Sequence, residues 1–481
     1  MKEITLTIKE IDWESLRRYL LRKDRLERQA FLELGLFESQ DRIELFAHRL
    51  WPIADNDYVS QQSYYVRPQS KVVVDAYSSF CRSGVTVHGH VHSHPFCSKA
   101  AFSAVDEKTL NEMIRGLSGL VRTAGLHKDS TCFQMVIGRD QSGFQGVLFD
   151  LREMKIGELV EIRVIGAGGI YIYSQKFHER EVSSLIDERL NRNIRWLGEE
   201  GQRILSQTHL GICGLGGAGA MIVANIRGLG FKEITLVDPD RVEQSNLNRL
   251  AGAGQADVES YKVDIFKREI RRVRPETTVN AVSSGVEDPR ALDKMKEADL
   301  IISAVDGMGP RAELQVLSAR FLKPLFDLGS GILVDKDKKV SRMGSQIIVY
   351  VPGGPCLACQ GLDLFNATQG LAGEVRRKTG YVKGTDLTPT SVATINSVVA
   401  GWAVNHVVRY LTGLGPIPLY TRIDQWTGTV DQLSFVKKES CPICGKQGIE
   451  GKGDNRVEFL IPPNPDSVFN IESVSREVIA C

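Results

Sequence analysis

The stretch "LGICGLGGAGAMIVANIRGLG", residues 210–230, decides the fold of the C-terminal half of this 481-residue chain. Gly214, Gly216, Gly217 and Gly219 stand between an apolar run typical of a strand and a second run long enough for a helix. Glycines at such a turn allow backbone amides to approach a phosphate at the N-terminus of the helix. By itself the loop fits dinucleotide dehydrogenases and nucleoside triphosphate enzymes equally well.

Apolar and amphipathic segments alternate on both sides of this loop from about residue 186. The sequence predicts strands at "EITLVD" (233–238), "DLIISAVD" (299–306) and "KPLFDLG" (323–329), and an amphipathic helix at "KVDIFKREIRRVRP" (262–275). Such alternation is typical of an α/β fold with a doubly wound, mainly parallel sheet.

The polar residues that follow the loop separate the two kinds of nucleotide enzyme. Asp238 ends the next strand and is placed to bind a ribose hydroxyl in either kind. Asn246, Arg249 and Lys262 follow it, and a hydride-transfer enzyme has no evident use for cations there. An enzyme that splits a triphosphate between its α and β phosphates needs them, because charge develops on the departing pyrophosphate. Asp306 ends a later strand and supplies a carboxylate for magnesium.

Residues 186–445 closely resemble the ThiF/MoeB adenylating superfamily, which includes the ubiquitin-activating enzymes. The opening RYxRQ element of the family corresponds to "RLNRN" (189–193), its Asp-x-Asp to Asp238 and Asp240, its SNLxRQ to "SNLNRL" (245–250), and its lysine to Lys262. The resemblance implies a Rossmann-like domain that uses ATP with Mg. It also implies a homodimer, in which Arg192 reaches the triphosphate of the neighbouring subunit.

Four of the nine cysteines form two CxxC pairs, Cys356 with Cys359 and Cys441 with Cys444. Eighty-one residues separate the pairs, and together they match the structural zinc site of the same family. Activating enzymes that carry the modifier as a thioester have a cysteine between the pairs, whereas this chain offers Thr388 and Thr390. The enzyme therefore stops at the acyl-adenylate, or a cysteine elsewhere, such as Cys481, forms the thioester.

The first block, residues 1–155, is expected to be an α+β domain with a metal site. A charged helix is predicted within residues 13–38, and strands at 63–68, 71–77, 86–92, 133–138 and 146–150. In "HGHVHSHP" (88–95), His92 and His94 come at the end of a strand, where they can converge with Asp106 on zinc. Three such ligands leave the fourth position to water, as in a catalytic site.

Two further residues complete the chemistry expected of that site. Glu27 is the candidate general base, although Glu33 lies close by in similar surroundings, and Ser103 is the candidate donor to a developing oxyanion. His88 and His90 are expected to support the ligands or to lie on the surface.

This block resembles the JAMM (JAB/MPN) zinc isopeptidases, whose signature is a glutamate, then HxHP, then SxxD. Residues 92–95 and 103–106 match that signature, with eight residues between His94 and Ser103 where the family usually has seven. The resemblance implies a catalytic zinc and hydrolysis of the bond after the C-terminal glycine of a modifier.

The sequence thus predicts a JAMM/MPN-like domain (1–155), a connector (156–185), a ThiF domain (186–445) and a C-terminal tail (446–481). A formal net charge of +1 and a pI of about 7.6 give no reason to expect nucleic acid or a membrane as partner. We expect a soluble cytoplasmic protein, of bacterial source by its resemblances.

The expected function joins two activities on one ubiquitin-like small protein, with a conjugating enzyme or a sulfur-transfer protein as a further partner. The JAMM domain would process or remove the modifier, and the ThiF domain would adenylate its terminal glycine. One alternative is activation of a sulfur carrier for cofactor biosynthesis, with the JAMM domain only trimming the carrier. The other is a binding scaffold with an inactive JAMM domain.

Overall fold

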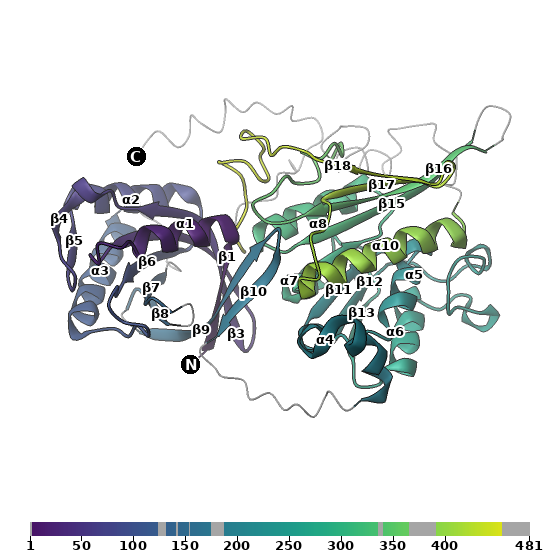
Figure 1. Ribbon diagram of the computed structural model, residues 1–481, viewed down its shortest axis with the longest axis horizontal. Coiled ribbons are helices and arrows are strands. Elements are labelled where there is room, and N and C mark those ends of the chain that lie inside the picture. The colour runs from purple at the N-terminus through teal and green to yellow at the C-terminus, as the bar shows by residue number, and fades with distance from the viewer. Residues whose placement is uncertain are drawn as a thin grey trace.

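Two units, each built on an eight-stranded sheet, lie side by side in the computed structural model of the chain (Figure 1). The structure describes residues 2–123, 131–140, 143–152, 154–174, 187–334, 340–364 and 391–454. Thr388, Thr390 and Cys481 lie outside these ranges. Among the described residues, no helix has both the length and the apolar character needed to cross a membrane.

The sheet of the N-terminal unit closes on itself. Its strand order is β1-β3-β2-β6-β7-β8-β9-β10, and β1 also pairs with β9. The strands are β1 (Lys2–Lys9), β2 (Gln29–Glu38), β3 (Arg42–Pro52), β6 (Val87–Ser93), β7 (Thr131–Ile137), β8 (Phe144–Asp150), β9 (Lys155–Gly166) and β10 (Gly169–Ser174). The helices are α1 (Glu10–Leu20), α2 (Ser70–Ser83), α3 (Ala104–Thr123) and the short η1 (Asp55–Asp57), and β4 (Tyr58–Gln61) pairs with β5 (Val66–Pro68).

Two elements of this unit differ from the prediction. The helix expected within residues 13–38 ends at Leu20, and residues 29–38 form strand β2. Residues 30–35 are buried on both faces of the sheet, which removes the alternation by which a strand is usually recognised. The strand expected at 71–77 is part of helix α2, which buries Ala76, Tyr77 and Phe80 at helical spacing and ends at Gly84 in the left-handed conformation.

The second unit has the predicted doubly wound, mainly parallel sheet. Its order is β13-β12-β11-β14-β15-β16-β17-β18, parallel from β13 to β15 and antiparallel beyond. The strands are β11 (His209–Cys213), β12 (Glu233–Val237), β13 (Thr278–Val282), β14 (Leu300–Ser303), β15 (Leu325–Val334), β16 (Val340–Tyr350), β17 (Tyr420–Asp424) and β18 (Thr429–Leu433). The order reverses between β11 and β14, and ligands of such sheets bind beyond the carboxyl ends of the strands at this point.

Helices cover both faces of that sheet. One core cluster joins α4 (Asn191–Leu205), α5 (Gly217–Ile226), α6 (Lys262–Val273) and α10 (Ala393–Thr412) to it, and a second joins α7 (Pro289–Glu297) and α8 (Met308–Arg320). The short helices are η3 (Glu188–Leu190), η4 (Gln244–Asn246) and η5 (Gln255–Asp257). Phe37 and Phe46 of the N-terminal unit belong to the second cluster, so the hydrophobic core is continuous between the units.

The boundaries of the units also differ from the prediction. Residues 156–174, expected in a connector, form most of β9 and all of β10, because β9 is needed to close the sheet against β1. The tail expected from residue 446 begins with a segment, residues 446–454, that lies against β2. The N–H of Gly35 donates to Gly451 O (3.2 Å), and the N–H of Asp454 donates to Leu36 O (2.8 Å).

Charged side chains join the two units in one buried pair and one half-buried pair. Lys323 Nζ lies 3.2 Å from Glu44 Oε2, and Arg163 Nη1 lies 2.6 Å from Asp299 Oδ1. Phe46 meets Phe321 edge to face, with ring centroids 5.5 Å apart. Because burial of unpaired charges is costly, these contacts hold the units in a fixed relation.

Candidate functional site

The glycine loop forms the turn from β11 into α5. Gly214 has a φ of 86°, and a Cβ there would lie 2.6 Å from the carbonyl carbon of Ala304 in the loop after β14. A Cβ at Gly219 would lie 2.0 Å from Gly214 O, whereas one at Gly216 would meet open space. Glycines 214 and 219 are therefore required by packing, and the N-terminus of α5 is open in front of Gly216.

Asp238, just beyond β12, fixes this turn from the side. Its Oδ2 accepts a hydrogen bond from the N–H of Leu215 (2.6 Å), and its Oδ1 accepts one from the N–H of Asp240 (2.9 Å). Lys262, the first residue of α6, places Nζ 2.7 Å from Asp240 Oδ2 and 3.8 Å from Asp238 Oδ1. Burial raises the pKa of Asp238, and the charge of Lys262 opposes that rise.

The other predicted residues lie around this group. Asn246 is buried in η4, and Arg249 donates from Nη1 to Ser245 O (2.9 Å) in the same segment. Asp306 is exposed just after β14, the neighbour of β11, at the same edge of the sheet. Arg192 is exposed on α4. The structure thus joins Asp238, Asp240 and Lys262 directly.

Sequence reasoning missed two residues beside the loop. Asn396 of α10 is buried, donates to Ser391 Oγ (2.9 Å), and would lie 2.1 Å from a Cβ at Gly217, so Gly217 leaves room for its amide. Arg311 of α8 donates to Val305 O (3.1 Å) and fixes the loop that carries Asp306. Neither has a local sequence signal, because each meets its partner through tertiary packing.

The four paired cysteines come together next to α8, whose Gln315 Oε1 accepts a hydrogen bond from the N–H of Leu357 (2.8 Å). Cys356 Sγ lies 3.6 Å from Cys441 Sγ, Cys359 Sγ lies 3.6 Å from Cys444 Sγ, and all four sulfurs lie within 4.8 Å of one another. Zn–S bonds of about 2.3 Å in a tetrahedron place sulfurs roughly 3.8 Å apart, so the cluster fits one zinc ion with a closed shell. Hydrogen bonding from Cys356 lowers the pKa of Cys444 to about 6, which favours a thiolate.

The family of the chain follows from a match to a family model. The model of the ThiF family matches residues 190–443, which is more than half of the chain. The chain belongs to the ThiF family.

Known proteins are similar to about half of the chain. Molybdopterin-synthase adenylyltransferase of Escherichia coli is 25% identical over 265 residues, covering 54% of this chain and 96% of that protein. SAMP-activating enzyme E1 of Haloferax volcanii is 24% identical over 276 residues, covering 56% and 92%. Among solved structures, E. coli MccB with succinimide has a TM-score of 0.44 at 20% identity, covering 54% of this chain and 74% of that chain.

The N-terminal unit lies outside the ThiF match and has its own cluster of ligand atoms. His92 Nε2 lies 3.1 Å from Asp106 Oδ1, and His94 Nε2 lies 3.4 Å from Asp106 Oδ2. One ligand atom from each of the three lies within 4.8 Å of the others. His92 is buried beside this carboxylate. The set fits zinc, whose nitrogen and oxygen ligands at about 2.0–2.2 Å stand roughly 3.3–3.5 Å apart.

Glu27 meets this cluster because of strand register. Strand β2 pairs with β6 so that Gln29 stands opposite His92, and the same register places Glu27 opposite His94. Glu27 Oε1 lies 3.8 Å from His94 Nε2, and burial raises the pKa of Glu27 to about 7. Burial acts to raise the pKa of Asp106, but hydrogen bonds from His92 and His94 outweigh it and lower that pKa.

Ser103 caps the first turn of α3 beside the same cluster. Its Oγ donates to Asp106 Oδ2 (2.8 Å), and its N–H donates to the same oxygen (2.7 Å). The segment between His94 and Ser103 is one residue longer than is usual in the JAMM family, and Asp106 still reaches both histidines.

The remaining candidates of this unit lie elsewhere. Glu33 accepts hydrogen bonds from Trp51 (3.1 Å) and Ser79 (2.6 Å) and stands opposite His88 in the sheet, away from His94. His88 and His90 are buried among aromatic rings, so neither lies on the surface. Of the two glutamates, the structure brings Glu27 to the ligand atoms.

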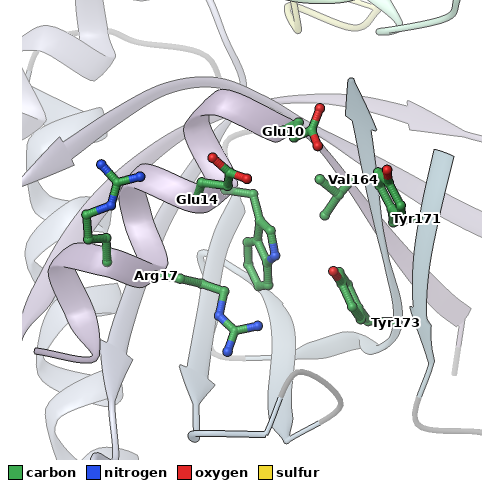
Figure 2. A pocket seen from close by; sticks show the side chains of 8 residues that line it. Glu10, Glu14, Arg17, Val164, Tyr171 and Tyr173 are labelled. Atoms are coloured by element: carbon green, nitrogen blue, oxygen red, sulfur yellow. The ribbon is translucent and has the colours of Figure 1, made fainter. Parts of the chain in front are cut away.

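A cavity of about 410 Å³ lies between α1 and the β9–β10 hairpin (Figure 2). Its lining includes Trp13, Arg17, Tyr171 and Tyr173. The rings of Trp13 and Tyr173 stack with their centroids 6.0 Å apart. None of its lining residues belongs to the glycine loop, the cysteine cluster or the histidine cluster.

Proposed function

We propose that the ThiF unit adenylates the C-terminal carboxylate of a small ubiquitin-like or sulfur-carrier protein. A carboxylate oxygen would bond to the α-phosphorus of ATP while the bond to pyrophosphate breaks, which leaves an acyl-adenylate. The observation that carries this proposal is the glycine turn held by Asp238 next to Lys262, in a chain of the ThiF family. The names of the two relatives, an adenylyltransferase and an activating enzyme, support it.

Each side chain has a role that follows from its place. Amides at the start of α5 would bind phosphate oxygens, and Asp238 and Asp240 would face the ribose side. Lys262 and Arg249 would stabilise charge on the departing pyrophosphate, with Asn246 orienting the loop that carries Arg249. Asp306 would hold Mg²⁺, which neutralises the phosphates when bound.

We also propose that the enzyme works as a homodimer. Arg192 is exposed on α4, as expected of a side chain that acts on the triphosphate of a second copy. The exposed Trp196 on the same helix, at 48% of its full exposure, provides apolar surface for such a contact.

Exchange of labelled pyrophosphate into ATP tests the adenylation step. With a suitable carrier protein the wild type should exchange, and Asp306→Ala should lower the rate by about 10²–10³, the loss typical of one electrostatic group. Asp293→Ala, which removes an exposed carboxylate on α7, should leave exchange unchanged. Full exchange in Asp306→Ala would show that the magnesium ligand is another residue.

For the N-terminal unit we propose zinc-dependent peptidase or isopeptidase activity on the same modifier. His92, His94 and Asp106 would hold the ion, which when bound acidifies water and polarises a carbonyl. Glu27, near His94, would take the proton of the attacking water at a carboxylate oxygen and pass it to the departing amine. The hydroxyl of Ser103, which donates to Asp106 in this structure, would turn to donate its hydrogen to the carbonyl oxygen as that oxygen gains charge.

The two reactions would meet at one chemical group. Hydrolysis after the terminal glycine frees a carboxylate, and adenylation consumes one. Because the sequence has no cysteine between residues 360 and 440, we propose that the acyl group passes from the adenylate directly to a thiol of a sulfur-transfer or conjugating partner, or to Cys481. The new bond is a thioester, and AMP leaves.

Metal analysis tests the N-terminal site. The purified wild type should contain two zinc ions per chain, one for the cysteine cluster and one for the histidine cluster. The double variant His92→Ala, His94→Ala should contain one. An unchanged zinc content in that variant would remove the peptidase assignment.

A further inference from the structure

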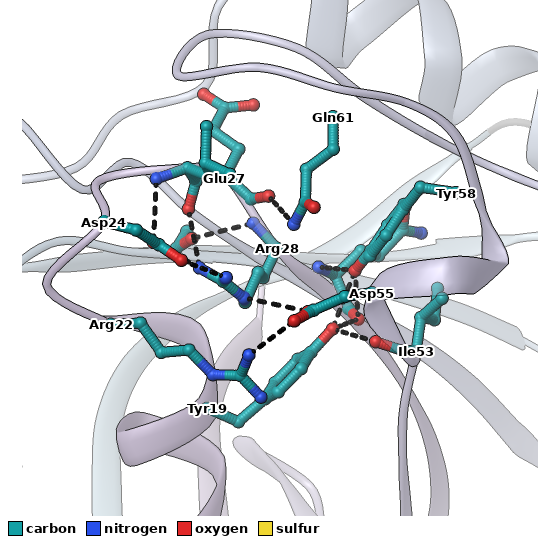
Figure 3. Close-up of polar contacts among 12 residues, drawn as sticks. Tyr19, Arg22, Asp24, Glu27, Arg28, Ile53, Asp55, Tyr58 and Gln61 are labelled. Atoms are coloured by element: carbon teal, nitrogen blue, oxygen red, sulfur yellow. Dashed lines mark hydrogen bonds and ion pairs between the residues drawn. The ribbon is translucent and has the colours of Figure 1, made fainter.

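The loop that carries Glu27 is anchored by Arg28, one of the largest fully buried side chains in the described chain (Figure 3). Its Nη1 donates to Asp24 Oδ1 (2.8 Å), its Nη2 contacts Asp24 Oδ2 (2.5 Å), and its Nε lies 3.6 Å from Asp55 Oδ1. One buried guanidinium thus ties the start of the loop to the segment after β3. Bidentate geometry of this kind is specific to arginine.

The backbone of Arg28 also pairs with the metal-ligand segment. Its N–H donates to Ser93 Oγ (3.1 Å), and the N–H of Ser93 donates to Arg28 O (3.0 Å). Ser93 stands between His92 and His94, so these two hydrogen bonds fix the position of both histidines relative to Arg28. The anchor therefore reaches the ligand segment through the main chain.

Glu27 itself is held on its other side. Its N–H donates to Gln62 O (2.8 Å), and its carbonyl accepts from Gln61 Nε2 (3.1 Å), as Figure 3 shows for Gln61. Its backbone is thus fixed between residues 61–62 and 93. The carboxylate is left to face His94 at 3.8 Å.

The loop needs such an anchor because it contains a strained residue. Arg25 has a φ of 60°, the left-handed region that is unfavourable for a residue other than glycine. Asp24 Oδ1 accepts from the N–H of Leu26 (3.2 Å), so the carboxylate that holds Arg28 also stabilises this turn. Arg25 then lies over the ring of Phe96, two residues after His94, at 5.6 Å.

We propose that Arg28 is a positioning residue for the hydrolytic site, which fixes Glu27 at its distance from the metal ligands. This inference rests on the proposed peptidase function of the N-terminal unit. Arg28 acts through geometry: its own charge is met by Asp24 and Asp55, and its backbone carries the constraint to Ser93.

The test compares full-length wild type with Arg28→Met and Arg28→Lys. The substrate is a carrier protein for which the chain exchanges pyrophosphate, extended past its terminal glycine by a fluorophore-labelled peptide. Arg28→Met should lower kcat about 10–10²-fold with KM within about twofold, because a misplaced base loses part of its contribution. Arg28→Lys keeps the positive charge but cannot form the bidentate contact with Asp24, so its kcat should lie between those of the wild type and Arg28→Met.

Two measurements separate positioning from a general loss of structure. Arg28→Met should keep two zinc ions per chain and wild-type pyrophosphate exchange, while the amides of residues 22–30 exchange hydrogen faster. In the double variant Glu27→Gln, Arg28→Met, kcat should fall no further than in Glu27→Gln alone, since Arg28 acts through Glu27.

Arg22→Met is the matched control, because it also removes an ion pair to Asp55 (2.8 Å) but is not paired with Ser93. It should leave kcat, KM and amide exchange unchanged. Full activity in Arg28→Met, or a further loss in the double variant, would overturn the positioning role alone. A wild type with one zinc and no cleavage would overturn the proposed peptidase function and this inference with it.

Discussion

Replacing His88 by leucine is expected to make the N-terminal unit less sensitive to acid. His88 is 1% exposed on β6, and neither ring nitrogen has a hydrogen-bond partner within the described residues. The rings of Tyr77, Phe80 and Phe31 surround it, with centroids 4.5, 5.2 and 5.8 Å away. Burial lowers the pKa of His88 to about 3, so the ring is neutral in the folded protein.

The size of the effect follows from that pKa. An unfolded chain binds a proton at this histidine below a pKa of about 6.5, whereas the folded protein does not until about pH 3. The free energy of unfolding therefore falls by about 1.4 kcal/mol per pH unit as the pH drops from 6.5 to 3. At pH 5 the loss is about 2 kcal/mol, a large fraction of the roughly 5–15 kcal/mol that stabilises a typical domain.

Urea unfolding at pH 7 and pH 5 measures this loss of unfolding free energy. The unfolding of the N-terminal unit is followed by the protection of the β6 and β7 amides from hydrogen exchange. Groups away from this position titrate alike in the wild type and in His88→Leu, and the pKa of the neighbouring His90 is held well below its usual value mainly by burial in either protein. The difference between the two proteins therefore reports on His88. We expect the variant to lose about 2 kcal/mol less than the wild type between the two pH values. Equal losses would show that the ring is charged, or solvated, in the folded state and would refute the reasoning.

Two further changes test the glycine loop and the contact between the units. Gly219→Ala should abolish pyrophosphate exchange, because its Cβ would lie 2.0 Å from Gly214 O, whereas Gly228→Ala, with open space around it, should retain exchange. Lys323→Met should lower the free energy of unfolding by about 3 kcal/mol in urea titrations, because it leaves Glu44 buried without one partner, and adding Glu44→Gln should restore part of this loss.

Much of the ThiF unit could be predicted from the sequence because its signals are local. Apolar strands alternate with amphipathic helices, and the strands expected at 233–238, 299–306 and 323–329 correspond to β12, β14 and β15. The same rules failed at β2, where both faces are buried, and at α2, whose valines favoured a strand. In each case tertiary packing overrode the local pattern.

The candidate sites divide in the same way. His92 ends strand β6, His94 follows it directly, and Asp106 comes twelve residues later, so spacing alone predicted that the three would meet. The pattern of the CxxC pairs indicated zinc, and the resemblance to a family joined the two pairs in one site. The residues that meet the sites from afar, Asn396 beside Gly217 above all, could not be predicted, because 179 positions of sequence lie between them and only packing makes them neighbours.

The contact between residues 446–454 and β2 has a consequence for synthesis on the ribosome. Strands β1 to β10 are complete once residue 174 has been made, but the bonds of Gly35 to Gly451 and of Leu36 to Asp454 are both in place only after residue 454 has emerged. At about 5–20 residues per second, the intervening 280 residues (454 − 174) take about 14–56 s. During that interval the nascent N-terminal unit exposes a backbone surface that the chain itself covers last.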